Sequence, residues 1–251
     1  AYSPDGRRIA FSSTRSGTEE IWLSNADGSN TVQLTSMSGP TTSNPQFSPD
    51  GRTILFNSRK EGKSDLYTIE LSSGALKRLT SHPEEEVQGA WSRDGKFLYF
   101  ASDSSEPGLW EINRMPSEGG PWVQVTQNSG IYAQESLDGN TLYFSDDNAV
   151  WSLPAADIGT GRTNPAKIID GLVYSINFGL TREGIYYMSA GPSPRQSTIS
   201  FFDFRTRKTR SVLQIDKLWW FGLTVSPDQR SVLYSVRDQD GTDLLLVEHA
   251  K

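Results

Sequence analysis

The chain has 251 residues, no cysteine and a formal net charge of −6 at pH 7. The lack of cysteine excludes disulfides, thiolate nucleophiles and cysteine-bound metals, and the acidic balance argues against broad nucleic-acid binding, which needs a concentrated basic face. Only 35% of the residues are hydrophobic, while 22 are glycine and 13 are proline, which favours a repetitive sheet protein over a compact helical one. No apolar run approaches the roughly 18 residues of a membrane-spanning helix, so no membrane insertion is expected.

A four-residue turn motif recurs along the whole chain at intervals of 44 or 45 residues. Its copies are Ser-Pro-Asp-Gly at 3–6 and 48–51, Ser-Arg-Asp-Gly at 92–95, Ser-Leu-Asp-Gly at 136–139, Thr-Arg-Glu-Gly at 181–184 and Ser-Pro-Asp-Gln at 226–229. The Asp carboxylate can accept hydrogen bonds from nearby amides and Gly tolerates a positive φ, so we interpret the motif as a structural turn. The turn residues are Asp5, Gly6, Asp50, Gly51, Asp94, Gly95, Asp138, Gly139 and Asp228.

Each copy of the turn lies among short apolar runs. In the first repeat one run follows the turn at 8–13, a second lies at 21–23 and a third ends in Leu34-Thr35. A short apolar run also precedes the turn, as at 45–47 in the second repeat. Four short strands in a repeat of this length are typical of a β-propeller blade.

The sequence therefore predicts an all-β, six-bladed β-propeller with four-stranded antiparallel blades. The single domain would span 1–251, with blades at about 1–42, 43–86, 87–130, 131–172, 173–218 and 219–251. Few residues follow the last turn, so the last blade is expected to lack its outermost strand within this chain. We expect that strand to lie upstream of Ala1 in a longer parent protein, and the open edge would also allow a strand-sharing dimer.

The Ser-Pro-Asp-Gly and Ser-Arg-Asp-Gly turns, followed by runs that end in Leu-Thr or Val-Thr, resemble the TolB-like propeller repeat. This repeat is found in the C-terminal domain of periplasmic TolB and in many bacterial multidomain proteins. The resemblance covers essentially the whole chain and implies the propeller fold and a periplasmic or cell-envelope location, although the composition is also compatible with the cytosol. It implies less about activity, because propellers host many unrelated functions.

In propellers the loops between blades, and those joining the second and third strands of a blade, gather on one face around the central channel. Aromatic, arginine and carboxylate side chains expected there suit a protein or peptide partner. On the Trp219-Trp220-Phe221 run, neighbouring side chains should point to opposite faces of the strand. For Glu84-Glu85-Glu86 a solvated loop is the simpler interpretation. The candidates are Arg15, Arg59, His82, Glu84, Glu85, Glu86, Tyr132, Tyr174, Arg195, Trp219, Trp220 and Arg237.

Nothing in the sequence predicts a catalytic residue, a metal site or a cofactor. The chain has two histidines, His82 and His249, and no Gly-x-Ser-x-Gly elbow. The basic cluster at 205–210 lacks interleaved aromatics, so no nucleic-acid binding is expected. The leading hypothesis is a non-catalytic protein-interaction or ligand-sensing scaffold in a larger bacterial protein. The alternative is the propeller of an enzyme, either the gating domain of a prolyl-oligopeptidase-like hydrolase or a metal-dependent lactonase or hydrolase at the channel mouth.

Overall fold

The computed structural model describes residues 1–127, 129–162, 164–193, 196–238 and 241–248, with the backbone alone for 218, 219, 237, 238 and 241–248. These residues form strands and one short 3-10 helix, η1 (Ala155–Asp157). None of them belongs to a helix of the length and apolar character that a membrane crossing needs.

The described strands form six antiparallel sheets, which we number 1 to 6 in chain order. Sheets 2 to 5 have four strands, and sheets 1 and 6 have three within the described residues. Sheet 1 holds β1 (Arg8–Ser13), β2 (Glu20–Asn25) and β3 (Val32–Gln33); sheet 2 holds β4 (Thr42–Phe47), β5 (Thr53–Ser58), β6 (Asp65–Glu70) and β7 (Leu76–Arg78); sheet 3 holds β8 (Glu86–Trp91), β9 (Phe97–Ser102), β10 (Glu111–Pro116) and β11 (Val123–Gln124). Sheet 4 holds β12 (Tyr132–Glu135), β13 (Thr141–Ser145), β14 (Ala149–Pro154) and β15 (Ala166–Asp170); sheet 5 holds β16 (Phe178–Leu180), β17 (Gly184–Ala190), β18 (Ser197–Asp203) and β19 (Thr209–Ile215); sheet 6 holds β20 (Leu218–Val225), β21 (Ser231–Asp238) and β22 (Gly241–Glu248).

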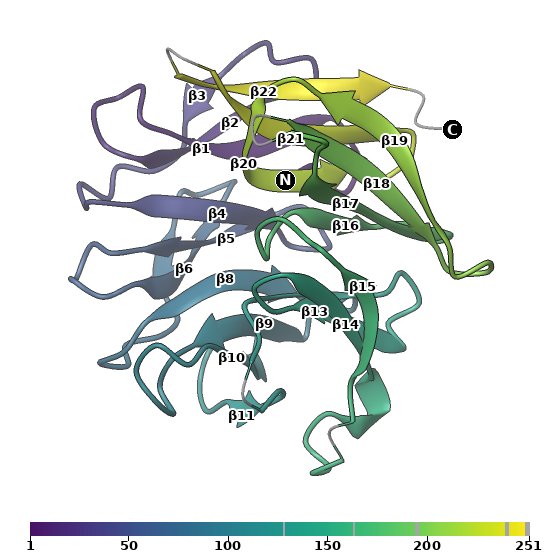
Figure 1. The fold of residues 1–251 in the computed structure, drawn as a ribbon. Helices are drawn as coiled ribbons and strands as arrows, with labels where there is room; N and C mark the ends of the chain where they lie inside the picture. Colours follow the sequence, from purple (N-terminus) through teal and green to yellow (C-terminus); the bar gives the residue numbers. More distant parts are fainter. Residues whose placement is uncertain (128, 163, 194–195, 239–240, 249–251) are drawn as a thin grey trace.

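The sheets follow one another around a common centre, which makes the fold an all-β propeller with antiparallel blades (Figure 1). The first strands of neighbouring sheets contact one another, β4 with β8, β8 with β12 and β16 with β20. These strands therefore lie innermost. In sheet 1 the same place is taken by the first residues of the chain, since Tyr2 pairs with Ile9 and the Ala10 amide donates to the Ala1 carbonyl.

The recurring turn is held by short local hydrogen bonds. In the second copy the Ser48 hydroxyl donates to Asp50 Oδ1 at 2.6 Å, and the Arg52 amide donates to the same oxygen at 3.1 Å. The Ser48 Oγ in turn accepts from the Thr53 amide at 3.0 Å. Gly51 has a φ of 71°, which an L side chain rarely adopts. The Asp carboxylate thus takes the place of a backbone carbonyl as the hydrogen-bond acceptor within the turn.

The same turns also connect one sheet to the next. A Cβ on Gly51 would lie 3.4 Å from the Pro4 ring, and one on Gly95 would lie 3.8 Å from the Pro49 ring. The last turn repeats this contact with the first, because Pro227 lies 3.7 Å from the Cβ position of Gly6. Sheet 6 therefore meets sheet 1 in the way that sheet 1 meets sheet 2, so the last sheet of the chain lies beside the first (Figure 1).

The threonine that ends each Leu-Thr or Val-Thr run has a structural role as well. Thr35, Thr80 and Thr126 each accept a hydrogen bond of 2.9 Å from an amide near the start of the third strand of their blade. The outermost strands β3, β7 and β11 have only two or three residues. The threonine bond holds these short edges against their neighbours.

The hydrophobic core is divided among the spaces between neighbouring sheets. Between sheets 2 and 3, for example, Leu55, Leu66, Leu98 and Phe100 are fully buried. A buried leucine of this kind contributes about 2–5 kcal/mol, as leucine-to-alanine substitutions show. Each sheet is therefore stabilised on both faces, which keeps the loops at its ends in place.

Candidate functional site

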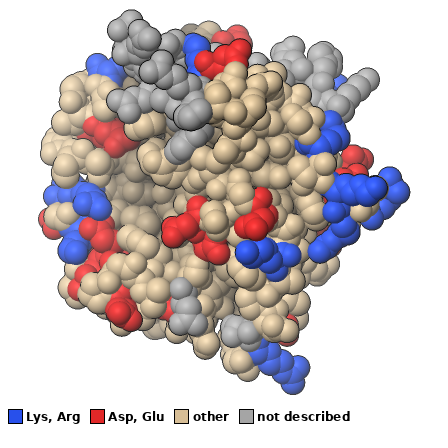
Figure 2. Space-filling model, viewed as in Figure 1, with Lys and Arg blue, Asp and Glu red and all other residues tan. Residues whose placement is uncertain are grey.

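The loops joining the second and third strands of each blade lie on one side of the ring, together with the connections between blades. We call this side the loop face; among the described residues it comprises 14–19, 36–41, 59–64, 79–85, 103–110, 125–127, 129–131, 146–148, 171–177, 191–193, 196 and 216–217. In the view of Figure 2 the charged side chains form small groups of both signs rather than one patch of a single sign. The most prominent basic group in that view lies at the right, over the hairpin that joins β18 and β19.

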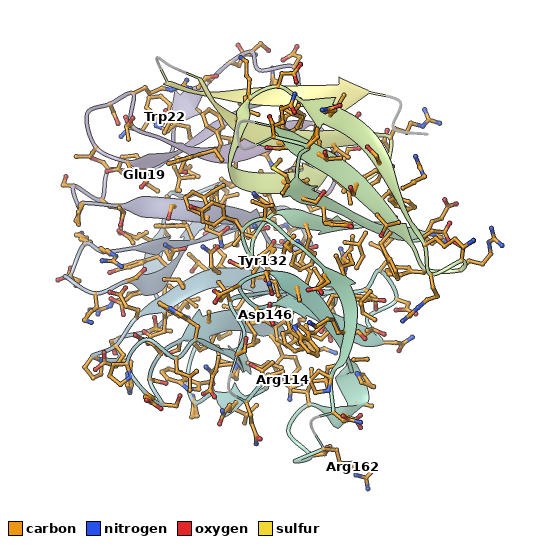
Figure 3. The ribbon with its side chains drawn as sticks, viewed as in Figure 1. Glu19, Trp22, Arg114, Tyr132, Asp146 and Arg162 are labelled. Carbon is orange, nitrogen blue, oxygen red and sulfur yellow. The ribbon has the colours of Figure 1, made fainter. Side chains whose placement is uncertain are left out.

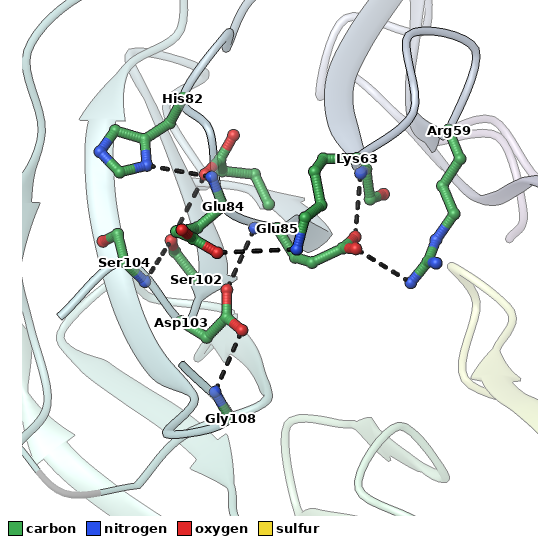
Figure 4. Close-up of polar contacts among 11 residues, drawn as sticks. Arg59, Lys63, His82, Glu84, Glu85, Ser102, Asp103, Ser104 and Gly108 are labelled. Atoms are coloured by element: carbon green, nitrogen blue, oxygen red, sulfur yellow. Dashed lines mark hydrogen bonds and ion pairs between the residues drawn. The ribbon is translucent and has the colours of Figure 1, made fainter. Parts of the chain in front are cut away.

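Charged residues from sheets 2 and 3 form one network on the loop face (Figure 4). Arg59 pairs with Glu85 at 3.3 Å, and Lys63 pairs with Glu84 at 3.6 Å. The other Glu85 oxygen accepts from the Ser64 amide at 2.9 Å, and the Glu85 amide donates to Asp103 Oδ1 at 3.0 Å. These predicted candidates therefore hold two neighbouring loops together, and their charges are already partnered.

His82 belongs to the same network. Its Nδ1 accepts from the Glu84 amide at 3.4 Å, and its ring meets the edge of Trp122 with centroids 5.6 Å apart. The position of the His82 ring is therefore explained by its packing against Trp122 and its hydrogen bond with the Glu84 amide.

The expectation that Glu84, Glu85 and Glu86 form a solvated loop is wrong for two of the three. Glu85 is 8% exposed and Glu86 is fully buried. The reason is that Glu86 begins strand β8, where its backbone pairs with Ser102 and its side chain turns into the space between sheets 2 and 3. Burial raises the pKa of Glu86 to about 8. Glu86 therefore cannot contact a partner at the surface.

Tyr132 is also buried, although the sequence places it among the channel-face candidates. It lies near the middle of the ring (Figure 3), with its hydroxyl accepting from Gln134 Nε2 at 2.7 Å and its ring against Phe178 at 5.4 Å. Burial raises the pKa of this phenol. The Tyr132 side chain packs inside the ring of sheets and is not available to a partner.

Arg15 covers two aromatic rings on sheet 1. Its guanidinium lies 5.1 Å from the Phe11 ring and 5.0 Å from the Trp22 ring. Nearby Glu19 (Figure 3) has a pKa raised by burial. Cation–π contacts of this kind stabilise an exposed site by about 0.5–1 kcal/mol.

An exposed aromatic pair lies on the loop-face side of sheets 5 and 6. Tyr174 and Phe221 have ring centroids 4.4 Å apart, and they are 40% and 43% exposed. Trp220 meets Phe221 at 5.2 Å and is itself half-buried. We call Tyr174 and Phe221 the aromatic pair.

The backbone around the aromatic pair departs from regular strand geometry. Tyr174 has a φ of 59°, which is uncommon for a residue other than glycine. The pairing of β20 with β21 shifts between Trp219 and Leu223, and Asn177 fixes this bulge by donating to the Trp220 carbonyl and accepting from the Gly222 amide. Bulges re-aim side chains and are frequent beside functional sites. Here the bulge brings Phe221 out of the sheet to meet Tyr174.

Three candidates, Arg195 and the side chains of Trp219 and Arg237, lie outside the described residues. Phe221 was not among the candidates, although it stands in the aromatic run that the sequence singled out. Its exposure depends on the bulge, for which Gly222 is the only local signal. Within the described chain, no three His, Cys, Asp or Glu side chains gather in a group suited to holding a metal ion.

A shallow cavity of about 530 Å³ lies between sheets 1 and 2 on the side of the recurring turns, opposite the loop face. Its lining residues are Arg8, Gly51, Arg52, Glu70, Leu71 and Ser72. Arg8 donates to the Gly51 carbonyl at 3.4 Å, and Glu70 accepts from Ser72 at 2.9 Å. None of the predicted partner-binding candidates lines this cavity, although the turn residue Gly51 does.

Comparison with known proteins supports the resemblance that the repeats indicated. Residues 1–165 match the family model described as the TolB beta propeller domain, and no curated protein sequence matches the chain. The structure of TolB from Acinetobacter baumannii superposes with a TM-score of 0.81 at 20% identity, covering 97% of this chain and 61% of that one. This chain thus spans less than two thirds of that TolB.

Enzymes share the fold. An oligogalacturonate lyase from Vibrio parahaemolyticus is similar with a TM-score of 0.65 and 15% identity, over 99% of this chain and 73% of that chain. A puromycin hydrolase is similar with a TM-score of 0.59 and 16% identity, over 89% of this chain and 39% of that one. At these identities the similarity shows a common fold and nothing about activity.

Proposed function

The chain belongs to the TolB β-propeller domain family, and from this premise we propose that it is a non-catalytic scaffold that binds a protein or peptide at its loop face. The observation that carries the proposal is the aromatic pair. Tyr174 and Phe221 are exposed, their ring centroids lie 4.4 Å apart, and Phe221 stands on the bulged strand β20. Rigid aromatic side chains supply large contact area at a low entropic cost, which is why they dominate binding energy at interfaces.

The charged network supports this proposal indirectly. Arg59, Lys63, Glu84 and Glu85 neutralise one another and tie the loops of sheets 2 and 3 together. A preorganised face loses less conformational entropy on binding than a mobile one. The paired charges thus contribute a stiff frame, and the aromatic pair contributes the contact.

Two finer points belong to the same proposal. The propeller has six blades, an arrangement favoured by the six sheets and by the contact between Pro227 and Gly6. Its place in the cell is the periplasm or envelope, as the resemblance to periplasmic TolB implies. Fractionation of bacteria that make this protein tests the location, and recovery in the cytosol contradicts it.

The second candidate function is the propeller domain of an enzyme. Its motivation is that the same fold occurs in enzymes, the oligogalacturonate lyase and the puromycin hydrolase among them. Turnover of a small substrate by the purified chain would support this alternative over the scaffold.

Site-specific photocrosslinking tests the scaffold proposal. A benzophenone amino acid is placed at Phe221 and, as a control, at Leu76, which is similarly exposed at 45% but lies on outer strand β7. We expect the protein labelled at position 221 to crosslink to one discrete partner in its host cell, and the protein labelled at position 76 to give no such product. Equal labelling from both positions, or none from either, contradicts a partner site at the loop face.

A further inference from the structure

Unpartnered buried oxygens gather where sheet 2 meets sheet 3. Among the described residues six buried side-chain atoms have no hydrogen-bond partner, and four of them are Asn57 Oδ1, Ser64 Oγ, Glu86 Oε2 and Gln88 Oε1. Asn57, Ser64 and Glu86 are 7%, 1% and 0% exposed. Leaving one such group unsatisfied costs about 1–3 kcal/mol, so four together require an explanation.

The register of the strands places the Asn57 and Ser64 side chains on the face of sheet 2 that packs against sheet 3. We call this boundary between sheets 2 and 3 the seam. A Cβ on Gly89 in β8 would lie 2.8 Å from the Leu55 side chain and 3.2 Å from the Leu66 side chain, so both leucines point from sheet 2 toward β8. Asn57 follows Leu55 by two residues and Ser64 precedes Leu66 by two, which directs them to the same side.

Glu86, the first residue of β8, meets them from sheet 3, and Gln88 lies on the same strand. The Glu86 amide donates to the Ser64 carbonyl at 2.8 Å, so these two residues are neighbours across the boundary between the sheets. The Glu86 side chain receives a bond of 3.4 Å from Ser102 and also contacts the Thr80 hydroxyl of sheet 2. Gln88 stands two residues further on, at a bulge where its φ is 57°.

The charge balance of the seam is incomplete. Asp65, the nearest acid of sheet 2, is neutralised by Arg78 at 2.7 Å, and Glu85 is paired with Arg59. Glu86 has no ion pair among the described residues, and the charged groups that act on it, Asp65 and Asp103, are both negative. A buried carboxylate needs a positive partner or a proton. The other free atoms of the seam are two amide oxygens and a hydroxyl, which with a carboxylate make the oxygen set that hard cations prefer.

We propose that Asn57, Ser64, Glu86 and Gln88 form a site for a single monovalent cation, Na⁺, in the seam between sheets 2 and 3. A monovalent ion matches the one uncompensated negative charge, whereas a divalent ion would leave a net positive charge in a buried place. The site stabilises the contact between two blades directly beneath the loop-face network. It is independent of the proposed partner site, since none of its residues belongs to the aromatic pair.

The test is thermal unfolding of the chain at pH 8 in NaCl or in choline chloride of equal ionic strength. At a Na⁺ concentration tenfold above the dissociation constant, we expect the wild-type Tm to be about 3–5 °C higher in NaCl. Glu86→Gln keeps the shape of the side chain and should abolish the difference, and Ser64→Ala should reduce it. The control is Glu84→Gln, which changes a half-buried neighbour paired with Lys63 and should keep the full difference.

The competing occupants give different results. Equal Tm values in the two salts overturn the proposal, because a water molecule or a proton then satisfies the seam. A larger rise with CaCl₂ than with NaCl overturns the monovalent assignment. A Na⁺ effect that survives in both Glu86→Gln and Ser64→Ala places the ion elsewhere. Broadening of the ²³Na resonance by the wild-type chain, and its loss in Glu86→Gln, supports the site directly.

Discussion

The hydroxyl of Tyr99 donates a hydrogen bond of 2.7 Å to Oε1 of Glu135 and so joins sheet 3 to the innermost strand of sheet 4. The second oxygen of Glu135 accepts from the Arg93 amide at 2.7 Å. Arg93 occupies the place that proline has in the first, second and sixth turns. At this boundary a carboxylate therefore replaces the proline–glycine contact that connects sheets 1, 2 and 3.

Tyr99→Phe should destabilise the chain by about 1.5–3 kcal/mol, because it removes the donor to a buried, charged acceptor. Urea unfolding of the variant measures this loss. Tyr143→Phe is the matched control, since the Tyr143 ring stacks on Phe204 and its hydroxyl makes no hydrogen bond among the described residues. An equal effect of both substitutions would show that the Tyr99–Glu135 bond contributes nothing.

Asp138→Asn should lower the Tm modestly at pH 7, because the turn carboxylate accepts from Ser136 and twice from Asn140. These bonds lower the pKa of Asp138 to about 2 from 3.8 in the unfolded chain. A carboxyl with a lowered pKa stabilises the fold above the unfolded value, and this contribution is lost as the pH falls. The gap between wild type and variant should therefore close between about pH 4 and pH 2. Asp147→Asn, in an exposed loop, is the control that should show no gap.

Glu86 should give the opposite dependence. Burial raises its pKa to about 8 from 4.5, so the folded protein holds a proton that the unfolded chain releases. In choline chloride the wild-type Tm should fall as the pH rises from about 4.5 to 8, and that of Glu86→Gln should stay flatter over this range. Parallel curves for the two proteins contradict a buried, protonated Glu86.

Gly89→Ala should destabilise the chain by about 1–3 kcal/mol, because the new Cβ would lie 2.8 Å from the Leu55 side chain. Shortening that neighbour should recover part of the loss, so Gly89→Ala with Leu55→Val should unfold at a higher urea concentration than the two separate effects predict. If the effects of the two substitutions on stability simply add, the strain does not arise from the contact between Gly89 and Leu55.

Phe221→Ala and Tyr174→Ala should leave the Tm within a few degrees of wild type, since both side chains are about 40% exposed. If the aromatic pair is the centre of a partner site, each should weaken binding of the crosslinked partner at least tenfold. Leu76→Ala is the control for a general effect of removing an exposed apolar side chain. Unchanged affinity in both aromatic variants removes the pair from the interface.

The sequence by itself was enough to predict the repeat, the turns and most strands. The reason is that their hydrogen bonds are local: Ser48, Asp50 and Thr53 complete a turn among themselves, whatever the rest of the chain does. The resemblance to the TolB-like repeat, carried by these same residues, is confirmed by the family match over residues 1–165. Local chemistry that recurs every 44 or 45 residues is visible without a structure.

Only the tertiary structure decided which candidate residues are accessible. Glu84 and Glu86 are two positions apart, yet one pairs with Lys63 at the surface and the other is fully buried. Tyr132 and Tyr174 are both aromatic residues between turns, but one fills the centre of the ring and the other is exposed. These differences arise from contacts between sheets, whose partners lie tens of residues away in the chain. The alternation of side chains along a strand cannot predict these differences. It determines which face of its own sheet a residue lies on, but not which residues of the next sheet pack against that face.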